Sequence, residues 1–261
     1  MTSGHPDPHS DASYRSHFDS ADRAKAYDEQ QYAAGSWSDL LWKIEKTQLL
    51  SIIRDLYGAL DRIDYLDFAS GTGRIIGFLE DKVDSATGIE ISPAMVERAR
   101  SRLRHGTVVC TDITDSTAPI EAQYDLITAY RFVLNAEPAL RIKAMRALAA
   151  RLRDGHSLLV FNNHGHIPSL KSFTHSRGHR RGRPEDWRPE GNVLPDSDVH
   201  ELAHQAGLRI VQQHGYGVLS AKSLRLLRED RALRIEERLS RMPRLARFGI
   251  NQLYVAQLDT N

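Results

Sequence analysis

The sequence predicts an α/β fold, doubly wound around a mostly parallel sheet. Between residues 63 and 161, short apolar runs alternate with amphipathic helical stretches. This alternation is typical of βαβ units, and the right-handed crossover rule places helices on both faces of the sheet. The first apolar run also ends in a turn of small residues from which a helix starts, as in sheets that bind a ligand at their carboxyl edge.

Each element follows from its local pattern. Ser92 and Pro93 supply a capping residue and a proline at the first helical position, so a helix is expected from residue 93. The helix over 38–57 has apolar residues at helical spacing and stops near Gly58. The expected strands are 63–68, 85–91, 107–110, 124–129, 157–161, 208–212 and 253–258. The expected helices are 38–57, 73–82, 93–104, 138–152, 197–206 and 222–242.

The chain divides into three parts on composition. Residues 1–12 contain Pro, Gly, Ser, His and Asp without periodicity, and we expect a disordered tail. Residues 13–60 are expected to form an N-terminal helical lid or cap. Residues 61–261 are expected to form the main domain, with insertions at 166–195 and 218–248.

Composition excludes several classes of protein. With 41% hydrophobic and 26% charged residues, the chain is typical of a soluble globular protein. No apolar run reaches the ~18 residues of a membrane span, and the first residues lack the apolar core of a signal peptide. A net charge of +1 argues against general nucleic-acid binding. Cys110 is the single cysteine, so no disulfide forms within the chain, and we expect a cytoplasmic protein.

Acidic residues stand at the ends of three successive expected strands, beside the glycine turn. Asp67 precedes the turn that contains Gly71 and Gly73, where small residues let the backbone approach a ligand and the helix start offers free N–H groups. Glu90 ends the next strand and can accept hydrogen bonds from both hydroxyls of a ribose. Asp112 ends the third strand and can accept one from an adenine amino group.

Ile91 and Met95 are placed to pack on the adenine ring. The opposing interpretation is that the three acidic residues are ordinary polar strand ends. Together, the pattern favours a nucleoside-containing cofactor.

These segments resemble the class I S-adenosylmethionine-dependent methyltransferases, which have a Rossmann-like fold. The likeness covers residues 60–165 and rests on YLDFASGTGR, GIEIS, CTDIT, YDLITAYRFVLN and LRDGHSLLVFNN. It implies a seven-stranded sheet of order 3-2-1-4-5-7-6 with the last strand antiparallel, S-adenosyl-L-methionine as cofactor, S-adenosyl-L-homocysteine as product, and no metal. The implied cofactor contacts are Asp67, Ala69, Ser70, Gly71, Gly73, Glu90, Ile91, Met95, Asp112, Ile113 and Tyr130. Ala69 departs from the glycine that the family often has at that position.

A nicotinamide cofactor is the alternative for the same turn. Gly71, Gly73 and Gly77 also spell G-x-G-x-x-x-G, and Glu90 would suit an NAD ribose. However, Asp67 would lie near the pyrophosphate and repel it. S-adenosylmethionine has no phosphate and carries a cationic sulfonium, so the methyltransferase interpretation is favoured.

The fourth and fifth strands should face the methyl acceptor. Arg131 follows the fourth strand and would contact either an anionic acceptor or an acidic neighbour. His164 follows the fifth and is a candidate general base for a hydroxyl, although it or His166 could be an ordinary hydrogen-bonded histidine. Alignment of the reactants alone can also supply much of the rate, without any base. The Asn- or Asp-Pro-Pro-aromatic motif of amide and base-amino methyltransferases is absent from the fourth strand.

We therefore expect methylation of a small molecule at a hydroxyl or an amine: a sugar, a secondary metabolite or a lipid precursor. RNA or protein methylation is the alternative, supported by the arginine-rich stretch 177–188. A non-catalytic protein that binds S-adenosylmethionine as a scaffold or sensor is the alternative from another class. No nucleic-acid partner and no integral membrane association are expected.

Two further segments have open interpretations. The aromatic-rich stretch from Tyr27 to Glu45 would either close over the cofactor or pack the first helix onto the sheet. The helix 222–242 would place Leu224, Leu227, Ile235, Leu239 and Met242 on one face. That face would cover the acceptor pocket or, less favoured because arginines share it, make weak peripheral contact with a membrane.

Overall fold

A seven-stranded mixed sheet forms the centre of the computed structural model, which describes residues 36–115, 121–167, 169, 180–181, 192–219 and 227–259. The disordered tail expected at 1–12, Tyr27, Tyr32 and most of the arginine-rich stretch lie outside these residues. The sheet consists of β1 (Asp64–Phe68), β2 (Ser85–Glu90), β3 (Thr107–Cys110), β4 (Leu126–Ala129), β5 (Leu158–Asn163), β9 (Leu208–Tyr216) and β10 (Asn251–Leu258).

The strand order confirms the expected topology. The sheet runs β3-β2-β1-β4-β5-β10-β9, which is 3-2-1-4-5-7-6 when its own strands are numbered along the chain. The first five strands pair in parallel, whereas β10 is antiparallel to both β5 and β9. In this register Asp67 lies between Gly88 of β2 and Thr128 of β4.

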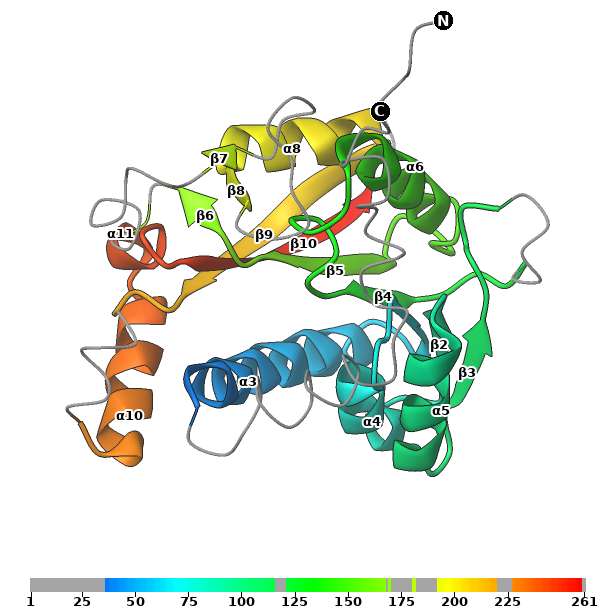
Figure 1. Cartoon of the computed structure of the whole chain (residues 1–261), viewed down its shortest axis with the longest axis horizontal. Helices are drawn as coiled ribbons and strands as arrows, with labels where there is room; N and C mark the ends of the chain where they lie inside the picture. The colour runs from blue at the N-terminus through cyan, green and yellow to red at the C-terminus, as the bar shows by residue number, and fades with distance from the viewer. Residues whose placement is uncertain are drawn as a thin grey trace, which may run out of the picture.

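Helices cover both faces of the sheet (Figure 1). On one face lie α6 (Pro138–Ala149) and α8 (Asp196–Gln205). On the other lie α3 (Trp37–Tyr57), α4 (Arg74–Leu79) with the 3-10 turn η2 (Glu80–Lys82), α5 (Pro93–Arg102) and α10 (Glu229–Ser240), which α11 (Pro243–Ala246) follows. The cap expected at α5 is present, since the Ser92 hydroxyl accepts from the Met95 N–H at 3.4 Å.

The apolar core has two main parts, one on each side of the sheet. Residues of α6 and α8 pack with one side of the strands, among them Met145, Leu148 and Val199. Residues of α3 and α4 pack with the other side, among them Leu49, Ile53 and Ile76. Because both faces are covered, the central parallel strands β1, β4 and β5 are buried along most of their length, as their apolar sequences require.

The expected insertion at 166–195 contains a small second sheet. Its strands are β6 (His166–Ile167), β8 (Asn192–Pro195) and β7 (Arg180–Arg181), in the order β6-β8-β7. His166 is buried here, with its Nε2 at 3.0 Å from the Arg247 carbonyl oxygen and its Nδ1 at 3.4 Å from Asp196. His166 is therefore an ordinary hydrogen-bonded histidine, which is one of the alternatives considered above for His164 and His166.

Helix α10 does not bury the apolar face expected for it. Ile235 is 37% exposed and Met242 is 51% exposed, so these two apolar side chains face solvent. The helix instead turns Ala232 and Glu236 inward, next to α3 and β9. The Glu236 carboxylate accepts from the N–H groups of residues 217, 218 and 219, so a hydrogen-bonded carboxylate replaces apolar contacts on this face.

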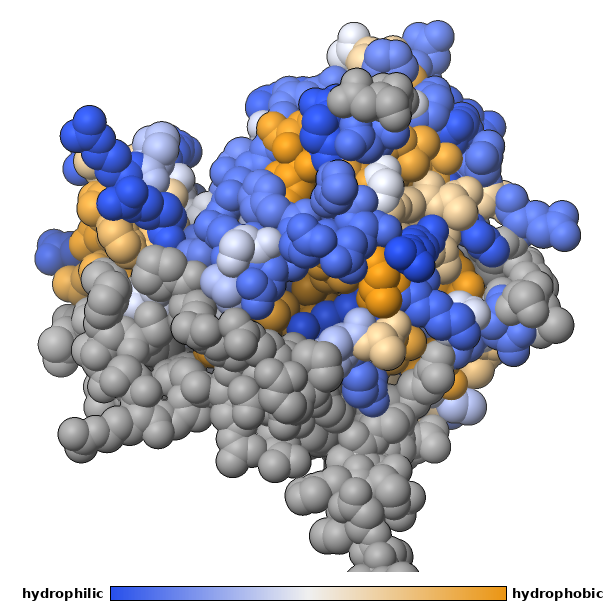
Figure 2. Space-filling view, turned by 90° about the horizontal axis from the view of Figure 1, so that it is seen from above, coloured by the Kyte–Doolittle hydropathy of each residue, from blue (hydrophilic) through white to orange (hydrophobic). Residues whose placement is uncertain are grey.

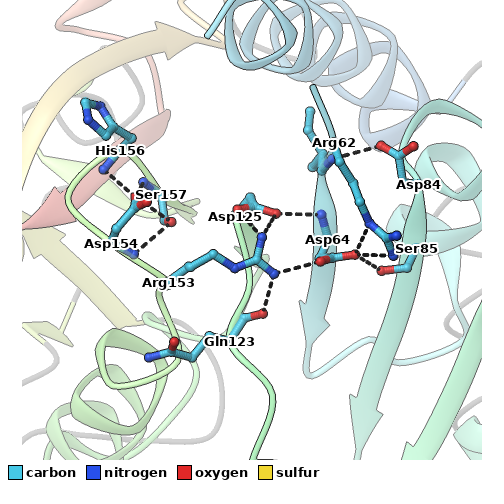
Figure 3. Close-up of polar contacts among 11 residues, drawn as sticks. Arg62, Asp64, Asp84, Ser85, Gln123, Asp125, Arg153, Asp154, His156 and Ser157 are labelled. Atoms are coloured by element: carbon cyan, nitrogen blue, oxygen red, sulfur yellow. Dashed lines mark hydrogen bonds and ion pairs between the residues drawn. The ribbon is translucent and has the colours of Figure 1, made fainter. Parts of the chain in front are cut away.

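Charged side chains tie the strands together at the amino edge of the sheet (Figure 3). Arg153 donates to both carboxylate oxygens of Asp125 and to Asp64, each at 2.7 Å. Asp64 also accepts from Ser85 at 2.6 Å and from Arg62 at 3.0 Å. An open polar hollow of about 480 Å³ lies against this network, at the end of the sheet opposite the carboxyl edge. These contacts join β1, β2 and the segments before β4 and β5.

The pH dependence of stability tests this network. The hydrogen bond from Ser85 and those from Arg153 and Arg62 lower the pKa of Asp64 from 3.8 to about 2. Because the folded pKa is depressed, its stabilisation of about 2 kcal/mol is present above the unfolded pKa and is lost as pH falls toward the folded one. Asp64→Asn should therefore lower the free energy of unfolding at neutral pH and cost much less near pH ~2.

Urea unfolding at the two pH values measures this difference. Asp55→Asn, an exposed carboxylate on α3, is the matched control and should change stability little at either pH. An equal cost of Asp64→Asn at both pH values would contradict the assignment.

Candidate cofactor and acceptor site

The turn after β1 has an unusual backbone. Ala69, Gly71 and Gly73 have φ values of +52°, +55° and +79°, in the left-handed region. The Ser70 N–H donates to the Ile89 carbonyl at 3.0 Å, which ties the turn to β2. A Cβ at Gly73 would lie 3.0 Å from Ala99 of α5, so glycine is also needed there for close packing. The turn therefore presents backbone, not side chains, at the carboxyl edge.

The buried Asp67 carboxylate supports this turn through hydrogen bonds to neighbouring elements. It is 1% exposed, accepts from the Thr128 hydroxyl at 2.7 Å and accepts from the Ile76 N–H at 3.1 Å. Thr128 is also 2.6 Å from the Tyr65 hydroxyl. Burial raises the pKa of Asp67 to about 7, against these hydrogen bonds, which lower it. Asp67 thus links β1, β4 and α4, and it supports the turn rather than offering a free carboxylate at its surface.

Glu90, the last residue of β2, lies at the same edge of the sheet. One carboxylate oxygen accepts from the Gly71 N–H at 2.9 Å, and the other accepts from Ile91 and Ser92, each at 2.9 Å. Burial raises the pKa of Glu90, while the three N–H groups favour its charged form. The carboxylate therefore stands directly between the glycine turn and the residues after β2.

The residues expected around an adenine gather beside Glu90. The Met95 side chain is buried, and its sulfur would lie 3.6 Å from a Cβ placed on Gly71. Ile113 is also buried, whereas Asp112 is half-buried and accepts from the Thr114 N–H and hydroxyl at 2.9 and 2.7 Å. The Cys110 thiol donates to the Ile91 carbonyl at 3.6 Å and so links the ends of β2 and β3.

The residue after β4 also has a left-handed backbone. Arg131 has φ +58°, its N–H donates to Asn162 at 2.6 Å, and its carbonyl accepts from Asn135 at 2.8 Å. Such a conformation costs a non-glycine residue free energy and persists only where its surroundings enforce it. Its charge acts on Glu45 and lowers the pKa of that carboxyl, although burial raises it overall. Arg131 therefore lies within electrostatic reach of the Glu45 carboxylate, and a contact with the acceptor stays a prediction.

His164 lies next to this residue, after β5. Burial, and then the positive charge of Arg131, hold the pKa of His164 well below 6.5, so its imidazole is neutral at physiological pH. Its Nδ1 is buried and has no hydrogen-bond partner among the described residues. A neutral imidazole with a free ring nitrogen can accept a proton.

A buried polar cluster on α3 was not among the expected site residues. Glu45 is 6% exposed, accepts from the Tyr216 hydroxyl at 2.5 Å and lies 3.7 Å from the Arg74 guanidinium. Arg74 also lies over the Trp42 ring, 4.4 Å from its centre. The aromatic-rich stretch pointed to this helix, but only the fold shows that Trp42 packs on α4 while Glu45 turns toward the sheet.

The described residues contain no group of three His, Cys, Asp or Glu side chains that could hold a metal ion. No helix within the described ranges is long and apolar enough to cross a membrane.

Comparisons with known proteins agree on the domain. Residues 66–155 match a family model described as a methyltransferase domain. The family model thus identifies a methyltransferase domain over this segment of the chain. This confirms the resemblance seen in the motifs, and the matched segment of the methyltransferase domain contains the glycine turn, Glu90 and Arg131.

A curated relative of the methyltransferase domain is a malonyl-[acyl-carrier protein] O-methyltransferase from Acetivibrio thermocellus, 30% identical over 137 residues. The alignment covers 50% of this chain and 46% of that protein, so the chain spans less than half of the relative's length.

Solved structures share the fold. A magnesium protoporphyrin IX methyltransferase from Synechocystis PCC 6803 with bound SAH has a TM-score of 0.59 at 14% identity, over 94% of this chain and 97% of that one. The N-methyltransferase NodS from Bradyrhizobium japonicum WM9, with S-adenosyl-L-homocysteine, has a TM-score of 0.57 at 16% identity, over 92% and 97%.

The left-handed Ala69 gives a test of the turn. A left-handed alanine costs about 1 kcal/mol or more, and glycine removes that cost while adding up to ~1 kcal/mol of unfolded-state entropy. Ala69→Gly should therefore leave the free energy of unfolding unchanged or raise it by up to about 1 kcal/mol, whereas Ala69→Val should lower it.

Ala94→Gly is the control, because Ala94 lies in the right-handed helix α5, where glycine should cost about 1 kcal/mol. Chemical denaturation measures all three variants. Equal destabilisation by Ala69→Gly and Ala94→Gly would contradict the left-handed turn.

Proposed function

We propose that this chain transfers a methyl group from S-adenosyl-L-methionine to a small-molecule acceptor, at a hydroxyl or an amine. The observation that carries the proposal is the convergence of the left-handed glycine turn and the Glu90 carboxylate at the carboxyl edge of β1 and β2. In open α/β sheets, ligands bind beyond this edge.

The residues at this edge fit the cofactor. Glu90 would hold the ribose, Asp112 and Ile113 the adenine, and the turn from Ala69 to Gly73 the methionine part, with Ile91, Met95 and Tyr130 packing nearby. The acidic Asp67 below the turn suits a cofactor that bears a positive sulfonium and no phosphate better than a dinucleotide. When bound, S-adenosyl-L-methionine supplies an electrophilic methyl group.

The acceptor side is proposed at the ends of β4 and β5. His164 is neutral and can take the proton that a hydroxyl or amine acceptor loses. Arg131, held in its strained conformation by Asn162 and Asn135, would position the acceptor against this imidazole. Relatives and structural neighbours named as O- and N-methyltransferases support either acceptor atom.

Loss of the Glu90 charge should weaken cofactor binding. Glu90→Gln removes the charge that would accept from the ribose hydroxyls, and hydrogen bonds to a charged group contribute roughly 1.5–3 kcal/mol, so affinity should fall at least about 10-fold. Titration calorimetry with S-adenosyl-L-methionine measures binding, and transfer of a labelled methyl group into a host extract measures activity.

Glu97→Gln, on the exposed side of α5, is the matched control and should bind like the wild type. Label in metabolites or lipids that Glu90→Gln abolishes would support the proposal. Label in RNA or protein would overturn the small-molecule acceptor, and binding without any transfer would favour a scaffold. Unchanged affinity in folded Glu90→Gln would overturn the cofactor site.

Replacing His164 tests whether its imidazole acts as a general base. His164→Ala should lower turnover ~100-fold or more with unchanged cofactor affinity, as expected for removal of a general base. Because the pKa of His164 lies well below 6.5, wild-type turnover should stay level as the pH falls through that value.

His156→Ala, an exposed histidine at the other edge of the sheet, is the control. Near-normal turnover of His164→Ala would show that alignment of the reactants, and not this imidazole, supplies the rate.

A further inference from the structure

One end of the molecule presents an exposed mixture of arginine and apolar side chains. It is formed by α10 and α11, outside the edge of the central sheet (Figure 1). Figure 2 shows hydrophobic surface beside strongly hydrophilic surface at the same end. We call this the α10–α11 surface. Its exposed arginines and large apolar residues are Arg231, Arg234, Ile235, Arg238, Arg241, Met242, Arg244 and Leu245, and the acidic Glu229 and Asp230 are exposed at its start.

The periodicity of α10 places arginine and apolar side chains together on this surface. Arg231, Ile235 and Arg238 are spaced four and three residues apart, so they share one face of α10. Met242 lies at the junction with α11, where it is 51% exposed, and Leu245 of α11 is 37% exposed. The apolar side chains therefore stand among guanidinium groups on a single outward face.

The inward face of α10 is already occupied. Glu236 is fully buried and accepts from three backbone N–H groups after β9, and Ala232 is buried beside it. The first turn is fixed to α3 by an ion pair between Glu229 and Lys43. These contacts hold the helix in place and fix which face points outward.

The charge of this surface differs from that of the chain as a whole. Residues 228–247 contain seven arginines, no lysine and four acidic residues, a net charge of +3, whereas the whole chain carries +1. Of the acidic residues, Glu229 and Asp230 are ion-paired and Glu236 is buried. The planar guanidinium groups match phosphate oxygens in geometry.

We propose that the α10–α11 surface binds the phosphate layer of an anionic lipid membrane. Arginine stems lie along apolar material while their guanidinium groups remain at phosphate level, so arginines and short apolar contacts can share one face. Ile235, Met242 and Leu245 enter the boundary between headgroups and acyl chains. The guanidinium groups supply the charge, and the three apolar side chains the contact area, that suit an anionic headgroup layer.

Vesicle co-sedimentation tests the proposal. The full chain should bind vesicles that contain phosphatidylglycerol, bind much less to pure phosphatidylcholine, and be weakened by salt. Arg231→Gln with Arg238→Gln should weaken binding about 30-fold, because each arginine near an anionic bilayer contributes a factor of about five. The matched control, Arg54→Gln with Arg209→Gln, removes the same charge from exposed positions elsewhere and should bind nearly as the wild type does.

A second pair of variants keeps the charge. Ile235→Ser with Met242→Ser should weaken vesicle binding in high salt, where charge is screened. The control is Leu50→Ser, which changes an exposed leucine on α3. An unchanged urea unfolding transition shows that each variant is folded, so this test is independent of cofactor binding and methyl transfer.

Two results would overturn the proposal. One is equal binding to neutral and anionic vesicles. The other is no binding to anionic vesicles together with arginine-dependent retention on polyglutamate, which would indicate an acidic protein partner.

Discussion

The geometry of the site depends on hydrogen bonds to one buried carboxylate. Asp67 accepts from Thr128 on β4 and from the Ile76 N–H at the start of α4, so it joins two strands and a helix just below the glycine turn. Burying a carboxylate is unfavourable unless such partners compensate it. The left-handed backbone at Ala69 is strained, and these contacts are among those that hold it there. Without them, the turn would lose its link to β4 and to the start of α4.

Buried carboxylates organise other parts of the molecule in the same way. Glu90 is held by N–H groups on both sides of the carboxyl edge, Glu236 by three N–H groups after β9, and Glu45 by Tyr216. Each connects segments far apart in the chain. The candidate site therefore rests on directional hydrogen bonds from backbone and hydroxyl groups, while the apolar layers on both faces of the sheet supply the bulk of the burial.

Local patterns in the sequence anticipated the fold closely. The strand expected at 107–110 has those bounds, and the helix expected from 93 begins there because Ser92 and Pro93 are local signals. Within the range 222–242 the described residues do form a helix, α10, but apolar spacing did not identify its buried side chains. One of them is the Glu236 carboxylate with three backbone donors, and no spacing rule reveals such donors in advance.

The sequence by itself determined the alternation of strands and helices, the glycine turn and the acidic residues at the ends of β1, β2 and β3, because these follow from short motifs and from the rules of parallel strand connection. The order of the strands followed only from the resemblance of those motifs to a known family. The tertiary structure alone decided what each acid does. Asp67 and Glu90 are both buried, but Asp67 joins the first strand to β4 and α4 below the turn, whereas Glu90 accepts from the Gly71 N–H of the turn itself. It also brought Glu45, Arg131 and His164 together, although 119 positions separate the first and last of them. Their pKa values depend on burial and on neighbouring charges, which exist only once the chain has folded.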